Sequence, residues 1–395
     1  MPLLTDFEFA ALAGALQDAG ADAWLLYDFR ATNPIAVRVL GVEGLATRRL
    51  FVLLPKDGPP VAVAHRIELG PLAGFPGDVL PYASWNELHE RLGGLIRGRT
   101  VAMEISPRDA VPYLDRVPFG VVELVRSLGA TVVSSAALVT RFAARWTATE
   151  LAGHRRAAEA LAAIAHEALH WAGQETARGA EVRETGLRAR VLQGIGRAGL
   201  VVDHPPIVAF QENAANPHYE PKEGADRRLQ TGQVLLLDLW AGPTQRTVFA
   251  DQTWMGFAGR APDAEVRRVW DTVRTARDAA VTRLRERWTE RATKHVTGAE
   301  LDDAARAVIR GAGYGEHFPH RTGHSIDRDL HGSGPHLDNF ETADDRALVP
   351  GVGFSVEPGI YLPGRFGVRS EINVFLNETG PEVTPAEPQR ELWLV

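Results

Sequence analysis

Side chains that could bind a metal ion recur through the C-terminal part of the chain, each in a short apolar or glycine-rich stretch. They are Asp238, Asp251, His324, Glu357 and Glu371. A single carboxylate in a hydrophobic run can be a buried acid with hydrogen-bond partners. Four carboxylates on successive strands of one half of the chain would repel each other unless cations neutralise them. The pattern therefore predicts a site for two cations.

The two aspartates lie in consecutive apolar runs, residues 233–240 and 247–257, and each is the only acid in its run. The Gly-Pro-Thr-Gln turn between the runs predicts a β-hairpin that brings Asp238 and Asp251 near each other. Taken alone, either aspartate is more often a capped structural acid. Their pairing across one hairpin gives the metal-binding interpretation equal weight.

Three histidines lie within one short segment, at His320, His324 and His331. A lone histidine is more often a core or surface residue, but a cluster of three favours a functional site. Gly323 directly precedes the central histidine. Because glycine has no side chain, it permits close approach of another backbone segment.

The two glutamates lie in further apolar runs, residues 352–362 and 366–376, which predict two paired strands with one glutamate in each. Arg369 is two residues from Glu371 and so shares its face of the strand. The alternative is an exposed Arg–Glu pair, which would contribute little. An isolated glutamate in each of two paired apolar strands favours the metal site.

The elements that must position these residues fall into two parts. The pattern of the first part, residues 1–145, predicts a small α/β domain. The predicted helices are at 7–20 and 109–128, and the predicted strands are at 23–27, 49–54, 60–64, 100–103 and 131–133. Thr147 and Glu150 then form a capping box that starts a long helix to about residue 173. Further helices are predicted at 181–198, 262–293 and 298–312. Helices and hairpins are not regularly interleaved in the second part, which indicates an α+β domain, residues 146–395.

The bulk composition excludes several classes of function. The chain has 395 residues and a net charge of −7, without the basic run that nucleic acid or an anionic membrane would require. It has no cysteine, so any metal must be held by oxygen and imidazole. The N-terminus lacks the pattern of a signal peptide, and no apolar run is long enough to span a membrane. We expect a soluble cytoplasmic protein.

Taken together, the motifs resemble the pita-bread metallopeptidases of family M24. The resemblance is carried by the order Asp, Asp, His, Glu, Glu and by the motifs His-x-x-Gly-His-x6-His, Val-Glu-Pro-Gly-Ile-Tyr and Val-Arg-Ser-Glu. It extends from about residue 147 to the end of the chain. The first domain is similar to the creatinase-like N-terminal domain of the proline-specific branch. The resemblance implies an α+β pita-bread catalytic domain preceded by a smaller α/β creatinase-like domain.

The resemblance also implies a role for each matched residue. The five potential ligands would hold two divalent ions (Mn²⁺, Co²⁺ or Zn²⁺), with Asp251 and Glu371 bridging them. Glu357 would also act as general base to a hydroxide bridging the metals. His218 and His331 would stabilise the tetrahedral intermediate. His320 and Arg369 match positions that bind substrate or support the ligands.

The implied activity is that of an Xaa-Pro dipeptidase, a metallo-exopeptidase that cleaves the Xaa-Pro bond of dipeptides and releases proline. Aminopeptidase P, which cleaves longer peptides with proline second, is the nearest alternative. A pita-bread binding module without catalysis is a third possibility, but such domains typically lose ligands. The resemblance further implies a homodimer.

Departures from the family pattern bear on substrate recognition. Asp238 and Asp251 are thirteen residues apart, against the family's usual eleven, although the two extra residues preserve strand parity, so both acids can face the same way. Asp327 replaces a common glycine. The free carboxylate of a dipeptide calls for an arginine. The candidates are Arg369 and the arginines of the predicted loop between residues 28 and 49, namely Arg30, Arg38, Arg48 and Arg49.

Overall fold

The chain divides into two compact units, Met1–Ala143 and Ala144–Val395. The structure is a computed structural model that describes residue 4 and residues 7–41, 47–291 and 293–395. Each unit has its own hydrophobic cores, because the buried clusters of the first unit contain no residue of the second.

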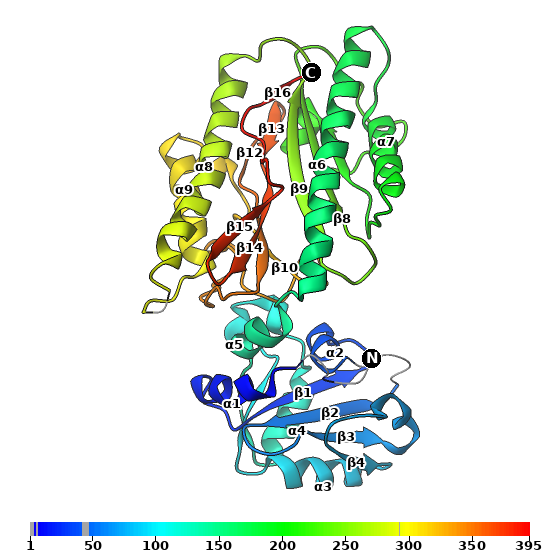
Figure 1. Cartoon of the computed structure of the whole chain (residues 1–395), viewed down its shortest axis with the longest axis vertical. Coiled ribbons are helices and arrows are strands. Elements are labelled where there is room, and N and C mark those ends of the chain that lie inside the picture. The colour runs from blue at the N-terminus through cyan, green and yellow to red at the C-terminus, as the bar shows by residue number, and fades with distance from the viewer. Residues whose placement is uncertain (1–3, 5–6, 42–46, 292) are drawn as a thin grey trace. The chain divides into compact units, whose positions relative to one another are not determined.

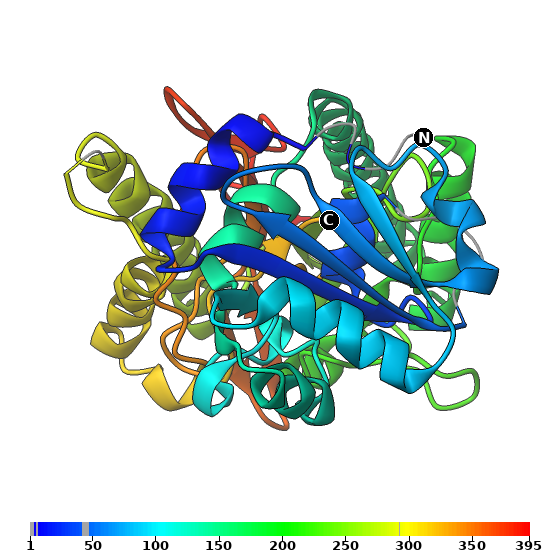
Figure 2. The same ribbon diagram turned by 90° about the horizontal axis from the view of Figure 1, so that it is seen from below.

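The first unit is built on a mixed sheet whose described strands follow the order β4-β3-β2-β1-β5-β6. Their bounds are β1 (Ala23–Phe29), β2 (Arg49–Pro55), β3 (Val61–His65), β4 (Asp78–Tyr82), β5 (Thr100–Met103) and β6 (Thr131–Ser134). Helices α3 (Trp85–Ile96) and α4 (Phe119–Ser127) pack on one face of the sheet (Figure 2). Helices α1 (Phe9–Asp18), α2 (Pro34–Leu40) and the short α5 (Ala136–Leu138) pack on the other. The alternation of side chains along β1 explains both layers, since Leu25 faces the first group of helices and Leu26 the second.

Two predictions for this unit were wrong in part. Residues 28–49 are not a simple loop, because they contain α2, whose first turn is capped by the side chain of Asn33 and starts with Pro34. The helix predicted at 109–128 is reduced to α4. Pro112 and Pro118 interrupt it, since each lacks the backbone N–H that a helix interior needs.

The second unit consists of two sheets and a short hairpin with helices outside them (Figure 1). Its helices are α6 (Ala148–Ala177), α7 (Glu184–Arg197), α8 (Ala264–Trp288) and α9 (Gly298–Gly311). The sheets have the orders β16-β9-β8-β7 and β10-β11-β14-β15, and β12 pairs with β13. The strand bounds are β7 (Ile207–Phe210), β8 (Val234–Ala241), β9 (Ala250–Phe257), β10 (Ser325–Ile326), β11 (Gly353–Val356), β12 (Gly359–Leu362), β13 (Phe366–Arg369), β14 (Ile372–Asn377), β15 (Gly380–Thr384) and β16 (Trp393–Leu394).

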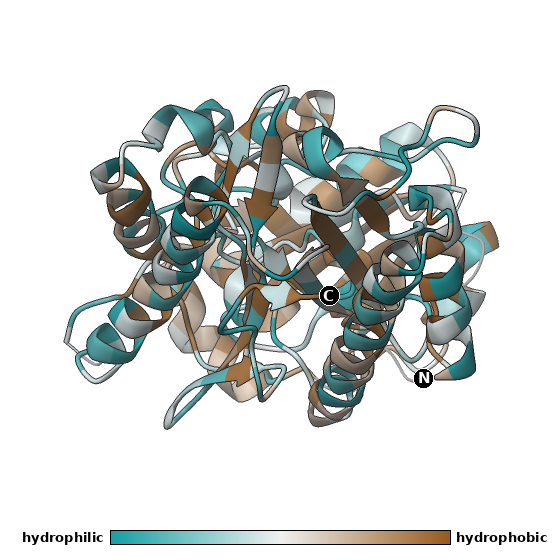
Figure 3. Ribbon diagram, turned by 90° about the horizontal axis from the view of Figure 1, so that it is seen from above, coloured by the Kyte–Doolittle hydropathy of each residue, from teal (hydrophilic) through white to brown (hydrophobic). Residues whose placement is uncertain are grey.

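The helices cover the sheets with their apolar sides. Helices α6 and α7 share one buried cluster with the first sheet, and α8 and α9 share another with strands of both sheets. Figure 3 shows the same division as brown strands between helices that carry teal on their outward sides. The capping box predicted at the start of α6 is confirmed, with Thr147 accepting from the Glu150 amide and Glu150 accepting from the Thr147 amide.

The β8–β9 hairpin is confirmed, and its side chains alternate between two environments. Leu235, Leu237 and Leu239 face the cluster under α6 and α7. The opposite face of β8 carries Asp238, which lies directly across from Thr253 of β9. Asp251 lies two residues before Thr253 and therefore on the same face. The predicted parity of the two aspartates is thus confirmed.

The predicted strands 352–362 and 366–376 are each broken in the middle, which corrects the sequence prediction. β11 pairs with β14, whereas β12 pairs with β13, so the long hairpin changes from one sheet to another. The break falls at Glu357-Pro358 on one side and at Ser370-Glu371 on the other. Both glutamates therefore leave the regular strands where the hairpin bends. Among the described residues, no helix is long and apolar enough to cross a membrane.

Candidate metal centre

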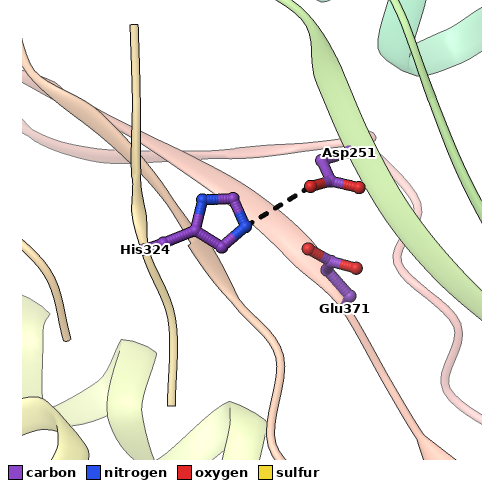
Figure 4. Close-up of side chains that lie close together, drawn as sticks. All are labelled: Asp251, His324 and Glu371. Carbon is purple, nitrogen blue, oxygen red and sulfur yellow. Dashed lines mark ion pairs between the residues drawn. The ribbon is translucent and has the colours of Figure 1, made fainter. Parts of the chain in front are cut away.

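Asp251, His324 and Glu371 converge from three separate segments onto one point (Figure 4). One potential ligand atom from each lies within 4.8 Å of the other two, and all three side chains are buried. Asp251 comes from β9, His324 directly precedes β10, and Glu371 directly precedes β14. Residues 120 positions apart in the sequence therefore meet because the start of β14 packs against β9, where the Glu371 amide donates to the Thr253 carbonyl at 3.3 Å.

The ring of His324 is held in the tautomer that suits metal binding. Its Nδ1 lies 3.2 Å from the carbonyl oxygen of Ser325, which can only accept, so Nδ1 carries the proton. Nε2 faces Asp251 Oδ2 and Glu357 Oε1, each at 3.4 Å, and these two carboxylates outweigh burial and raise the pKa of His324. A metal ion would take the place of the Nε2 proton. This is the arrangement in which a backbone carbonyl orients a metal-binding histidine.

Asp238 and Glu357, the other two predicted ligands, border this cluster. Asp238 accepts from the Thr253 hydroxyl at 2.9 Å and from the guanidinium of Arg369. Glu357 Oε1 lies 3.1 Å from the hydroxyl of Ser355, which also accepts from the His324 amide. The structure therefore brings all five predicted ligands into one buried region, although the group that meets at a single point is Asp251, His324 and Glu371.

The hydroxyl of Thr253 connects the ligands in a way that the sequence did not single out. It lies 2.9 Å from Asp238 Oδ1 and 2.9 Å from Glu371 Oε2, and it accepts from Arg369 Nε at 2.9 Å. The signal that could have found it is its position, two residues after Asp251 and therefore on the face that carries the aspartates.

The carboxylates of the cluster are buried close together, and this shifts their pKa values. Burial raises the pKa of Asp238 to about 6 and raises the pKa of Asp251. Burial also raises the pKa of Glu371 well above its ordinary value, and the charge of Asp251 raises it further. Glu357 behaves differently, because the charges of His324 and Arg369 outweigh burial and lower its pKa to about 2. The raised pKa values mean that ionised carboxylates are unfavourable here unless cations neutralise them.

These residues fit a divalent cation on a further observation. Within the described residues, Glu371 Oε1 is buried and has no hydrogen-bond partner. A buried carboxylate oxygen without a partner is costly. Together with the oxygen and imidazole donors around it, this oxygen suits a hard or borderline cation.

Arg369 and His320 are held by neighbours inside the site. Arg369 is buried, and its nitrogens contact Asp238, Thr253 and, at 3.5 Å, the hydroxyl of Tyr361. His320 lies 2.8 Å from the same hydroxyl through Nε2. Burial raises the pKa of Tyr361 to about 12. This geometry supports the interpretation that Arg369 orients a ligand, whereas a substrate-binding role for either residue stays a prediction.

His331 and His218 lie at the open side of the cluster. The ring of His331 is 4.2 Å from the ring of His324, measured between centroids, and its side chain is exposed. The charge of His324 lowers the pKa of His331 to about 3, and the charge of His218 adds to this effect. His331 is therefore a neutral imidazole at neutral pH. His218 is exposed, and its amide donates to Asn216 at 3.1 Å.

Comparison with known proteins points to one family. The family model described as "Metallopeptidase family M24" matches residues 152–378. The chain is similar to a probable dipeptidase PepE of Mycobacterium tuberculosis, with 29% identity over 379 residues that cover 94% of this chain and 89% of the relative. It is also similar to an Xaa-Pro dipeptidase of Lactobacillus delbrueckii subsp. lactis, with 36% identity over 165 residues that cover 42% and 40% of the two chains.

A solved structure extends the likeness to nearly the whole chain. The crystal structure of dipeptidase PepE from Mycobacterium ulcerans matches with a TM-score of 0.76 and 25% identity, and the match covers 99% of this chain and 98% of the other. The predicted fold class, an α+β pita-bread domain after a smaller N-terminal domain, is confirmed.

Gly323 is predicted to be essential for the placement of His324. A Cβ atom at this position would lie 2.0 Å from the backbone oxygen of Ser355, which confirms the expected close approach. We expect Gly323→Ala to lower the free energy of unfolding by about 1–3 kcal/mol, as overpacking does, and to weaken binding of divalent cations. Gly311→Ala, whose Cβ meets nothing within 4 Å, is the matched control and should cost nothing. Equal losses in the two variants, measured by denaturant unfolding, would contradict this account.

The raised carboxyl pKa values predict how the metal-free protein responds to pH. Near pH 4 the unfolded chain begins to release its carboxyl protons, whereas the folded chain retains those of Glu371 and Asp238. The folded state then holds more protons, so this site makes stability fall as pH rises from about 4 through 6. Glu371→Gln should therefore raise the melting temperature of metal-stripped protein at pH 8. The rise should be about 2–4 °C for each kcal/mol gained in the free energy of unfolding.

The same variant should gain nothing near pH 4, and added divalent cations should stabilise the wild type more than Glu371→Gln. Thermal unfolding followed by circular dichroism at both pH values, with and without chelator, makes the comparison. A metal-stripped variant that is less stable than the wild type at pH 8 would show that the carboxylate is not under repulsion.

Proposed function

The chain belongs to metallopeptidase family M24, and from this premise we propose that it is an Xaa-Pro dipeptidase with two divalent metal ions. The observation that carries the proposal is the buried meeting of Asp251, His324 and Glu371, bordered by Asp238 and Glu357. Two relatives support the substrate class, since one is a probable dipeptidase and the other an Xaa-Pro dipeptidase.

The proposed ions are Mn²⁺, Co²⁺ or Zn²⁺, which accept carboxylate oxygen and a single imidazole. Asp251, His324 and Glu371, whose ligand atoms lie within 4.8 Å of one another, would hold the ions together with Asp238 and Glu357, and the resemblance implies that Asp251 and Glu371 are shared between them. When bound, such ions lower the pKa of a water molecule and polarise a peptide carbonyl.

The side chains around the ions would do the remaining chemistry. Glu357, kept ionised by His324 and Arg369, would accept a proton from the attacking water and pass it to the proline nitrogen. His331, as a neutral imidazole at the open side, would donate a hydrogen bond to the oxygen that gains charge. His218 would position the substrate beside it. His320 and Arg369 would hold Tyr361 and Asp238 in place.

Several expectations from the resemblance complete the proposal. The domains would be residues 1–145, creatinase-like, and residues 146–395, catalytic. The protein would act as a cytoplasmic homodimer on small peptides.

A preference for dipeptides over longer peptides requires a cationic side chain that binds the C-terminal carboxylate of the dipeptide. Arg369 is already bound inside the site, so it is less suited to this task. A cavity of about 490 Å³ is lined by His331 and by Arg246, which lies at the tip of the β8–β9 hairpin. This is the turn with two residues more than the family pattern.

Arg246 is available to a ligand. Its side chain is exposed and has no ion-pair or hydrogen-bond partner among the described residues. The neighbouring Gln245 donates to the Val202 carbonyl at 3.0 Å, which fixes the tip of the hairpin. Arg328 also lines the cavity, but Glu150 binds it at 2.9 Å. We propose that Arg246 binds the carboxylate of the proline residue.

Metal-dependent release of proline tests the proposed function. We expect metal-stripped protein to be inactive on Met-Pro and Ala-Pro and to recover with Mn²⁺, Co²⁺ or Zn²⁺, while Ala-Pro-Ala stays intact. Glu357→Gln should lose about 10²–10⁴-fold in kcat. Cleavage of Ala-Pro-Ala would assign aminopeptidase P instead. No cleavage with any of the metals would reject the peptidase and leave a binding module.

A second experiment tests the carboxylate anchor separately. Arg246→Gln should raise KM for Ala-Pro by roughly 10–100-fold, the loss of a hydrogen bond to a charged group. It should not change hydrolysis of Ala-Pro amide, which lacks the carboxylate. Arg328→Gln is the matched control and should leave KM for Ala-Pro nearly unchanged. An equal effect of Arg246→Gln on acid and amide would reject the anchor while leaving the dipeptidase assignment intact.

A further inference from the structure

We propose that His166 and His170 form a second site, on the surface of α6, for one divalent transition-metal ion of the nickel, copper and zinc group. Both lie in the segment His166-Glu167-Ala168-Leu169-His170. Side chains four residues apart on a helix lie one above the other on the same face. Two histidines at this spacing can bind one ion. Neither residue belongs to the candidate metal centre.

The two imidazoles already lie together on the helix. Their ring centroids are 4.2 Å apart, at an angle of 55° between the planes. His166 is exposed and His170 is half-buried. No ring nitrogen of either has a hydrogen-bond or ion-pair partner in the part of the chain that the structure describes. Nitrogen donors free on one helix face are what nickel, copper and zinc ions take up.

The surroundings hold the pair in place and favour the neutral form of His170. The ring of Trp393 contacts His166 edge-on at 5.1 Å and stacks against His170 at 6.0 Å. Trp254 stacks on Trp393 at 4.8 Å and so fixes it in turn. This packing limits rotation of the imidazoles, which reduces the entropy lost on binding. Burial lowers the pKa of His170, and the neighbouring His166 lowers it further, which favours the neutral ring that binds metal.

The site is suited to binding and not to hydrolysis. The sequence has the form H-E-x-x-H, in which the glutamate of zinc peptidases is the general base. Here Glu167 accepts from Arg190 of the neighbouring helix α7 at 2.8 Å. The described residues contain one group of three potential ligands, and it is Asp251, His324 and Glu371. Water molecules must therefore complete the coordination at the histidine pair.

An ion at this site would stabilise α6, which packs against a strand of the candidate metal centre. Helix α6 packs on β9, the strand that carries Asp251, and Gln252 donates to the Ala158 carbonyl of α6 at 2.9 Å. A ligand that binds only the folded chain stabilises it by mass action. The site would also add one ion to any metal count made on the whole protein.

The test separates the two metal sites by substitution in the full-length chain. In an Asp251→Asn/Glu371→Gln background, Ni²⁺ is titrated by isothermal calorimetry. We expect one Ni²⁺ per chain, reduced to background by His166→Gln or by His170→Gln. Glu167→Gln is the matched control on the same turn and should keep the ion. Trp393 should report binding independently, because bound Cu²⁺ quenches an adjacent indole, and Trp393→Phe should bind Cu²⁺ with reduced quenching.

The proposal fails if the background variant binds no Ni²⁺ or if both histidine variants bind it unchanged. It also fails if Glu167→Gln abolishes binding, since the ion would then depend on the carboxylate. Should the background variant unfold, the wild type replaces it. The wild type must then take up one Ni²⁺ more than His170→Gln, and equal uptake would reject the site.

Discussion

The main constraint on the second unit is that it buries several carboxylates close together, where they repel each other. Asp238, Asp251 and Glu371 have raised pKa values because they leave water and because they face each other. Burial of charge without compensation costs more than most single interactions contribute. The fold can therefore carry this site only where cations supply the missing charge, from Arg369 and His324 or from bound metal.

The hairpin that carries Glu357 and Glu371 passes from one sheet to another at these two residues. In the register that both halves of the hairpin share, Glu357 lies directly across from Glu371. The break at Pro358 and Ser370 frees both glutamates from the ladder while β11–β14 and β12–β13 keep the register on either side. The Ser370 amide still reaches the Pro358 carbonyl across the break, at 3.3 Å. The bend thus belongs to the construction of the site.

Much of this arrangement was predictable from local patterns in the sequence. The rest was not predictable, and the reasons can be identified. The hairpin of Asp238 and Asp251, the capping box at Thr147 and the close approach at Gly323 follow from period, spacing and the size of one side chain. A Pro-Gly turn directly after Glu357 was visible in the sequence, but the division of the hairpin between two sheets was missed, because only pairing with a second segment shows it. Thr253 was missed because its role exists only when Glu371 arrives from a distant strand.

Thr253 shows how the cluster couples metal binding to protons. Its hydroxyl accepts from Arg369 and lies 2.9 Å from an oxygen of Asp238 and from an oxygen of Glu371. A hydroxyl has one proton, so it can donate to only one of these oxygens. The other contact requires a proton on the carboxyl group itself, and the raised pKa of Glu371 supplies it in the metal-free protein. A cation that binds Glu371 must displace this proton, and the affinity of the site for metal therefore rises with pH.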